Sequence, residues 1–140
     1  MSKTSEMKLV RIIMNKNSDI QTIILKEKSG NRFLSIGIGN PEVNAIKMQL
    51  AGIKPPRPLT HDLLKNTIYS LGYRVKKIIV TKLENSTYYA KIIIISPGKK
   101  KKEIDARPSD SIALALRANA PIYASEELLN QVASFNVWYQ

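Results

Sequence analysis

The stretch YRVKKIIVTKLENSTYYAKIIIISPGKKKKEIDARPSDSIALALRAN, residues 73–119, decides the fold. It begins with two runs that are rich in β-branched residues, 73–83 and 88–95, on either side of the polar sequence 84–87. This pattern predicts a long β-hairpin. The hairpin is expected to form the middle of a sheet, with further elements before and after it in the chain.

Downstream of the hairpin the pattern changes from strand to helix. Pro97-Gly98 and the lysines after it predict a turn, because neither Pro nor Gly continues a strand. The following residues predict a short returning strand over 102–106 and a helix over 108–119. Beyond that helix we expect a short extended stretch over 120–123, one or two helical turns over 126–132 and an edge strand over 134–139.

Upstream of the hairpin the sequence predicts three strands and then two helices. The predicted strands cover residues 8–14, 20–26 and 33–38, with turn residues between them. The first predicted helix begins with Asn40 as its cap and ends before Gly52. The second runs from residue 59 or 60 to Leu71, after a connector at 54–58 whose three prolines exclude helix and central strand.

These elements predict one compact α+β domain over residues 7–140, with a largely antiparallel or mixed sheet packed by three main helices. A chain of 140 residues with 44% hydrophobic content is long enough to bury a core of this kind. Residues 1–6 are polar and are expected to be a disordered N-terminus.

Composition excludes several classes of chemistry. The chain has no cysteine and one histidine, which excludes disulfides, thiol nucleophiles and zinc sites built from several histidines. Its longest aliphatic run is only Ile92–Ile95, so no membrane-spanning segment is expected. Because the N-terminus also does not resemble a secretory signal, we expect a cytoplasmic protein.

The chain is strongly basic, with a formal net charge of +11. A positive surface attracts phosphates, which favours RNA or DNA as a partner. The densest basic run is Lys99, Lys100, Lys101 and Lys102, at a predicted hairpin tip. Such a run can contact phosphates without reading sequence, or it can be a solvated turn that protects a sheet edge.

Two predicted helix starts share a motif in which arginine, proline and aspartate follow one another. Arg57-Pro58 leads to His61-Asp62, and Arg107-Pro108 leads to Asp110. Proline favours helix entry, Thr60 or Ser109 can cap free amides, and an arginine beside a helix N-terminus can bind a phosphate. Alternatively, the arginines and aspartates pair with each other and fix the loops in place.

The candidate catalytic residues are the acids and the histidine near these helix starts, namely Glu42, His61, Asp62, Asp105 and Asp110. Asp62, Asp105 and Asp110 together could bind Mg²⁺ or Mn²⁺, which needs two or three converging carboxylates. His61 could transfer protons, since its ordinary pKa is near 6.5, or it could simply cap a helix. The candidate nucleic-acid contacts are Arg57, Lys65, Arg107, Arg117 and the four lysines at 99–102.

Three blocks of the sequence resemble the bifunctional nuclease domain family. They are FLSIGIG (33–39) leading to Glu42, GIKPPRPLTHDLLKN (52–66), and DARPSDSIALALR (105–117) followed by APIY (120–123). Their order and spacing also match, and the resemblance covers residues 8–132. It implies a compact α+β domain that self-associates, most simply as a dimer, and that acts as a nuclease on both RNA and DNA.

The sequence leaves two other functions open beside a nuclease. One is a non-catalytic nucleic-acid-binding or regulatory module that acts through charge alone. The other is an oligomeric scaffold in which the Arg-Pro helix starts stabilise the fold or an interface.

Overall fold

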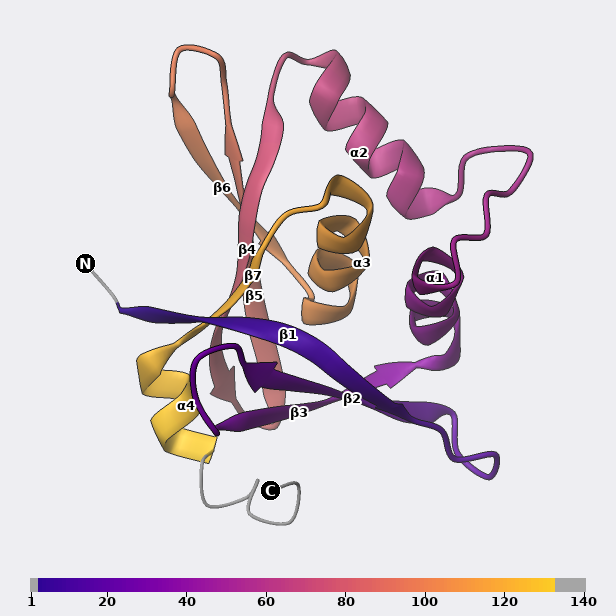
Figure 1. Cartoon of the computed structure of the whole chain (residues 1–140), viewed down its shortest axis with the longest axis vertical. Helices are drawn as coiled ribbons and strands as arrows, with labels where there is room; N and C mark the ends of the chain where they lie inside the picture. The colour runs from indigo at the N-terminus through magenta and orange to yellow at the C-terminus, as the bar shows by residue number, and fades with distance from the viewer. Residues whose placement is uncertain (1–2, 133–140) are drawn as a thin grey trace.

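Two antiparallel groups of strands and one short connecting strand form the sheet of this protein. The computed structural model describes residues 3–132, and Figure 1 shows its seven strands and four helices. The strands are β1 (Thr4–Ile13), β2 (Ile20–Glu27), β3 (Phe33–Gly39), β4 (Arg74–Glu84), β5 (Thr87–Ile95), β6 (Lys101–Ala106) and β7 (Ile122–Ser125). The helices are α1 (Asn40–Leu50), α2 (Thr60–Ser70), α3 (Pro108–Ala118) and α4 (Glu126–Val132).

The strand order is β3-β2-β1-β7-β4-β5-β6, so β7 joins the N-terminal group to the hairpin group. It pairs antiparallel with β1 and parallel with β4, which makes the sheet mixed. The sheet is strongly twisted, since β1 crosses β4 and β5 at a steep angle in Figure 1. The predicted α+β class is therefore confirmed. The stretch predicted over 120–123 is a central strand that begins at Ile122.

The long hairpin forms as the sequence predicts. Its turn residues Asn85 and Ser86 have φ of 50° and 62°, as in the turns whose twist matches that of a two-stranded ribbon. The β5–β6 connection contains the predicted Pro97-Gly98 turn, and Lys99 follows it with φ of 64°.

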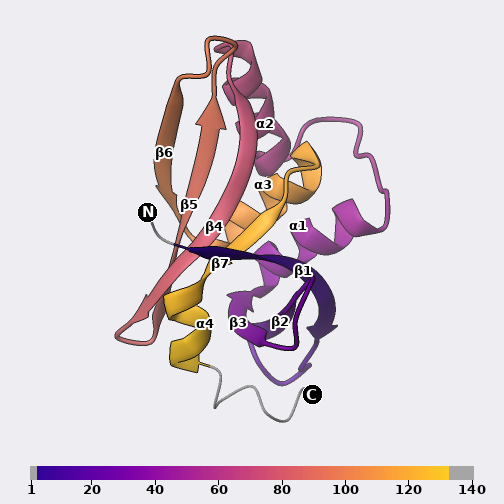
Figure 2. The ribbon, with the colours of Figure 1, turned by 60° about the vertical axis from the view of Figure 1, so that its left-hand side comes forward.

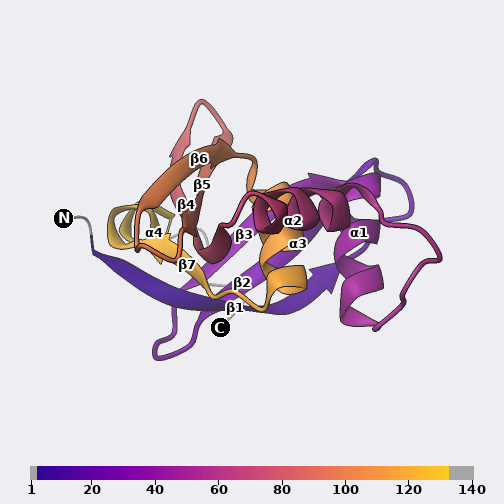
Figure 3. The same cartoon turned by 90° about the horizontal axis from the view of Figure 1, so that it is seen from above.

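The main core lies between the sheet and helices α1, α2 and α3, which gather on one side in Figures 2 and 3. α3 is the central helix, with eight of its eleven residues buried. Ile112, Leu114 and Ala115 on α3 belong to the same apolar cluster as Ile78 and Ile92 of the hairpin. Small residues such as Ala115 let the helix approach the strands closely. No helix in the described part of the chain is long and apolar enough to cross a bilayer.

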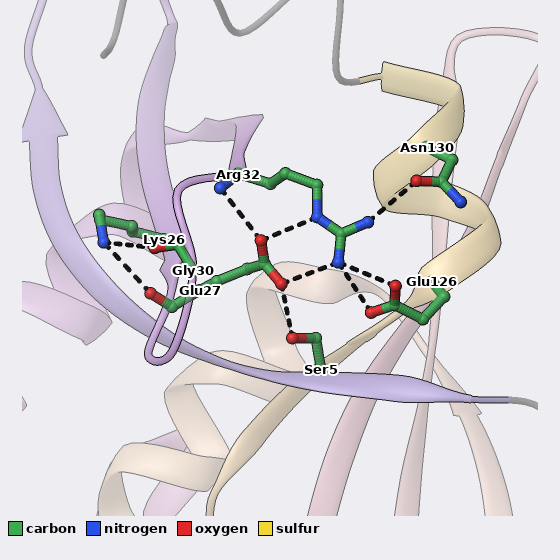
Figure 4. Close-up of polar contacts among 7 residues, drawn as sticks. All are labelled: Ser5, Lys26, Glu27, Gly30, Arg32, Glu126 and Asn130. Carbon is green, nitrogen blue, oxygen red and sulfur yellow. Dashed lines mark hydrogen bonds and ion pairs between the residues drawn. The ribbon is translucent and has the colours of Figure 1, made fainter.

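α4 lies away from the other three helices and is held by Arg32 (Figure 4). Arg32 Nη2 lies 2.8 Å from both Glu27 Oε2 and Glu126 Oε1, and Arg32 Nη1 lies 2.9 Å from Asn130 Oδ1. The Ser5 hydroxyl donates to Glu27 as well, over 2.7 Å. One guanidinium therefore connects the β2–β3 turn and the end of β2 to α4.

Two local predictions were wrong, and a third cannot be compared. Within the stretch predicted to be disordered, Thr4, Ser5 and Glu6 belong to β1, because β7 supplies their hydrogen-bond partners. Gly39 rather than Asn40 is the N-cap of α1, and the Asn40 side chain instead accepts a hydrogen bond from Gln21. The strand predicted over 134–139 lies outside the described residues.

Candidate active site at two helix starts

The first helix start belongs to α2 and follows the proline-rich connector at 54–58. The chain enters α2 through Leu59, whose backbone is extended at φ −84° and ψ 176°. The Leu59 amide donates to Asp62 Oδ2 over 2.9 Å, and this bond is the main reason that the pKa of Asp62 lies below its ordinary value. Asp62 therefore accepts a hydrogen bond from one of the backbone amides that the start of α2 leaves without a helical partner. The Thr60 hydroxyl was predicted to cap this helix, and it does not.

The second helix start belongs to α3 and is organised by an arginine–aspartate pair. Arg107 is the N-cap and Pro108 the first helical residue, as the sequence predicts. Arg107 Nε lies 2.7 Å from Asp110 Oδ2, and its Nη2 lies 3.1 Å from Asp110 Oδ1. Burial raises the pKa of Asp110, but the hydrogen bonds from Arg107 and His61 outweigh it, so the pKa is lowered overall. Asp110 is therefore a carboxylate at neutral pH.

The two helix starts meet, because His61 Nε2 of α2 lies 2.8 Å from Asp110 Oδ1 of α3. A carboxylate only accepts hydrogen bonds, so the neutral imidazole carries its proton on Nε2 and leaves a lone pair on Nδ1. The His61 side chain is 12% exposed and that of Asp110 29%. A histidine whose tautomer is set by a hydrogen-bonded carboxylate is a common way to prepare a proton acceptor.

Glu42, on the first turn of α1, lies near Arg107 at the start of α3. It lines one cavity together with Arg107, and after the larger effect of Asp110 its charge also raises the pKa of Arg107. Gly39 makes room for it, because a Cβ at residue 39 would collide with Glu42 Oε1. We name Glu42, His61, Arg107 and Asp110 the helix-mouth site.

A cavity of about 450 Å³ opens beside the helix-mouth site, between the start of α3 and β3. Its polar lining includes Glu42, Arg107, Ser109, Ser86 and Thr87, and its apolar lining includes Ile20, Ile36, Ile38, Tyr88 and Pro108. Ser109 was predicted only as a possible cap of the helix, yet its hydroxyl makes no cap bond. The Arg-Pro-Ser-Asp motif marked this place, but the strands that complete the cavity are distant in sequence.

Arg117, which the sequence predicts to contact nucleic acid, is an internal residue in the structure. Its side chain is only 4% exposed. Nε lies 2.9 Å from Asp62 Oδ1, Nη1 donates to Ala113 O over 3.0 Å, and Nη2 donates to Ala45 O over 3.1 Å. Arg117 therefore ties α1, α2 and α3 together, and Asp62 is its partner.

The other predicted contacts are dispersed. Lys65 donates to Arg117 O over 3.1 Å and lies over the Tyr69 ring, so part of its donor capacity is used within the protein. Arg57 is exposed on the connector, and the lysines at 99–102 are exposed at the β5–β6 turn and the first two residues of β6. Asp105 is exposed on β6 in register with Lys91, and no bond within residues 3–132 joins it to the helix-mouth site.

The predicted metal ligands do not converge. Asp62 pairs with Arg117 and Asp110 with Arg107, while Asp105 stands apart on β6. Among the residues that the structure describes, no three His, Asp or Glu side chains form a group that could hold an ion. In this arrangement Asp62, Asp105 and Asp110 therefore do not form a single Mg²⁺ or Mn²⁺ site.

Comparison with known proteins places this chain in a family. The model of the bifunctional nuclease domain matches residues 23–136, a span that contains all four residues of the helix-mouth site. The chain belongs to the bifunctional nuclease domain family. The predicted resemblance is thus confirmed, and both Arg-Pro helix starts lie inside the part of the chain that defines family membership.

Relatives within the bifunctional nuclease domain family differ in length. An uncharacterized protein of Mycobacterium tuberculosis is 39% identical over 126 residues, which is 90% of this chain and 74% of that protein. Bifunctional nuclease 1 of Arabidopsis thaliana is 28% identical over 110 residues, or 76% of this chain and 34% of the relative. Bifunctional nuclease 1 of Oryza sativa subsp. japonica is 27% identical over an equal length. This chain therefore corresponds to about a third of each plant protein.

Proposed function

We propose that this chain is a nuclease that hydrolyses phosphodiester bonds of RNA and/or DNA with low sequence specificity. The contact between His61 and Asp110 carries the proposal, because it joins a proton-transfer group to a phosphate-binding arginine, Arg107. Family membership and the names of the plant relatives support the same activity.

Arg107 is suited to bind the phosphate. Its side chain is 64% exposed although Asp110 holds the Nε edge, so part of the guanidinium can still contact an anion. The free amides at the start of α3 add positive potential at the same point. Contacts of this kind recognise the backbone and not the bases, which accounts for low sequence specificity.

His61 and Glu42 are suited to move the protons. When water attacks phosphorus, it loses a proton as the new P–O bond forms, and the leaving oxygen gains one as the old bond breaks. His61 can accept the first proton at Nδ1, since Asp110 holds Nε2. Glu42 faces the cavity beside Arg107 and, after taking a proton from solvent, can donate it to the leaving oxygen.

Assistance by Mg²⁺ or Mn²⁺ stays a prediction of the sequence, and no step above depends on an ion. Cleavage rates measured in EDTA, in Mg²⁺ and in Mn²⁺ decide the requirement. Self-association as a dimer and a cytoplasmic location also stay predictions, and light scattering on the purified chain tests the first of them.

One observation favours a non-catalytic nucleic-acid-binding or regulatory function instead. Asp62 and Asp110 are each bound to an arginine, as expected of residues that only fix loops in place. The two functions differ in their products, because a binding module retains nucleic acid without shortening it.

The deciding experiment compares the purified chain with its His61→Ala variant on end-labelled single-stranded RNA and DNA. We expect fragments with the unaltered chain and a large loss with the variant. Equal cleavage by both proteins would mean that another nuclease in the preparation is responsible.

A further inference from the structure

The cavity beside the helix-mouth site has a lining of two chemical kinds. Arg107 and Ser109 at the start of α3 are polar, and Ile20, Ile36 and Tyr88 from three strands are apolar. A volume of about 450 Å³ falls within the range of roughly 300–1,000 Å³ for small-molecule sites. A lining that is partly charged and partly apolar suits a ligand with an anionic end and an aromatic end.

Ser109 adds a hydroxyl to the polar part of the lining. The residue as a whole is only 5% exposed, but its hydroxyl lines the cavity and makes no hydrogen bond within the part of the chain that the structure describes. The hydroxyl is therefore open to the cavity and available to a ligand. The hydroxyl stands at the second residue of α3, where backbone amides also lack helical partners. A phosphate at this point would satisfy both.

Ile20 is the most exposed apolar residue of the lining. It is 57% exposed, and a Cβ at Gly37 would lie 3.1 Å from its Cγ2 atom, so Gly37 leaves room for the Ile20 side chain. The half-buried Tyr88 lines the same cavity. Apolar and aromatic side chains accept any of the bases, because each base has a π face.

We propose that this cavity is a nucleotide pocket, with one phosphate at Arg107 and Ser109 and the adjoining base against Ile20 and Tyr88. The proposal rests on the proposed nuclease function and names the unit of substrate that the site holds. Glu42 lies in the same cavity and repels phosphate, so it restricts the anion to the Arg107 side. It can accept a hydrogen bond from a sugar hydroxyl.

Calorimetry with the whole chain tests the pocket, using adenosine monophosphate, adenosine and inorganic phosphate as separate probes. We expect the nucleotide to bind at least ten-fold more tightly than phosphate. Ile20→Ser should bring nucleotide affinity down toward that of phosphate and leave phosphate binding unchanged. Ser109→Ala should weaken both nucleotide and phosphate several-fold.

Val10→Ser is the matched control, because Val10 is also exposed, at 42%, and lies on the neighbouring strand outside the cavity lining. Equal affinity for nucleotide and phosphate, or an equal loss in Val10→Ser and Ile20→Ser, would overturn the pocket. The assay needs no cleavage. If His61→Ala abolishes cleavage while Ile20→Ser leaves nucleotide binding unchanged, the pocket fails and the nuclease function stands. If the nucleotide binds as described without cleavage, the nuclease function fails and the pocket stands.

Discussion

His61 Nε2 lies 2.8 Å from Asp110 Oδ1, although the two residues are 49 positions apart in the chain. One of them stands on the first turn of α2 and the other on the first turn of α3. Neither helix start holds the arrangement alone, so the arrangement exists only after the two helices have packed together. A variant can therefore reduce activity in two ways. It can change the His61–Asp110 pair itself, or it can weaken the packing of α2 on α3 that brings the pair together.

Asp110→Asn should slow cleavage by roughly 10²- to 10⁴-fold, the usual contribution of general acid–base catalysis. The variant keeps the size of the side chain but removes the charge that fixes the His61 tautomer. Initial rates on labelled single strands measure the effect, with circular dichroism to verify the fold. Asp105→Asn is the control, since Asp105 is exposed on β6. A similar loss in both variants would contradict the assignment.

Arg117→Met should lower the free energy of unfolding by about 3 kcal/mol, because it leaves the partly buried Asp62 carboxylate and two helix carbonyls without a partner. Urea titration followed by circular dichroism measures the change. Arg57→Met is its counterpart on the exposed connector and should stay within about 0.5 kcal/mol of the unaltered chain. A stable Arg117→Met protein with weakened nucleic-acid binding would restore Arg117 as a surface contact.

Stability should fall in acid as Glu27 becomes protonated. Hydrogen bonds from Arg32, above all, lower the pKa of Glu27 from 4.5 to about 2. A group whose pKa is depressed by folding contributes stability above its unfolded pKa and loses it as the pH falls toward the folded one. The contribution is on the order of 3 kcal/mol and should disappear between about pH 4.5 and 2.

Urea midpoints of the unaltered chain and Glu27→Gln, measured across that pH range, test this expectation. The variant should be less stable at pH 6, and its stability should change less between pH 4.5 and 2. Glu84→Gln is a fair comparison, because Glu84 is exposed at the end of β4. Parallel acid profiles for the unaltered chain and Glu27→Gln would refute the role of this pair.

Nucleic-acid affinity should depend steeply on salt. Each phosphate contact contributes about 0.7 to the slope of log affinity against log salt for a single strand. Replacing the exposed lysines at 99–102 by glutamine should therefore reduce that slope by up to about 3 if all four contact phosphate. Fluorescence anisotropy between 50 and 200 mM salt measures it. An unchanged slope would mean that the β5–β6 turn is only a solvated turn.

The sequence predicted most of the fold because strands and helices here have strong local patterns. The hairpin of β4 and β5 is bounded by turn residues, and both Arg-Pro motifs begin helices at the residues expected. β7 has only four residues, and its parallel pairing with β4 depends on a neighbour far away in the chain. No local pattern encodes such a pairing.

The site could be predicted only as a set of separate residues. His61 and Asp110 each stood in a recognisable motif, but their contact depends on how α2 packs on α3. Arg117 looked like an ordinary basic residue near a helix end, and only its neighbours Asp62 and Ala45 show that it is internal. The cavity at Ser109 is invisible in sequence because β2, β3 and β5 complete it.

The position of β7 also governs when the protein can finish folding. The strand is made after β1 to β6, yet it must insert between β1 and β4 for the two halves of the sheet to become continuous. Until Ile122–Ser125 leaves the ribosome, both halves expose an open strand edge. We therefore expect the nascent chain to be most prone to aggregation shortly before β7 is synthesised, when the apolar residues of β1 to β6 and of α3 are already present.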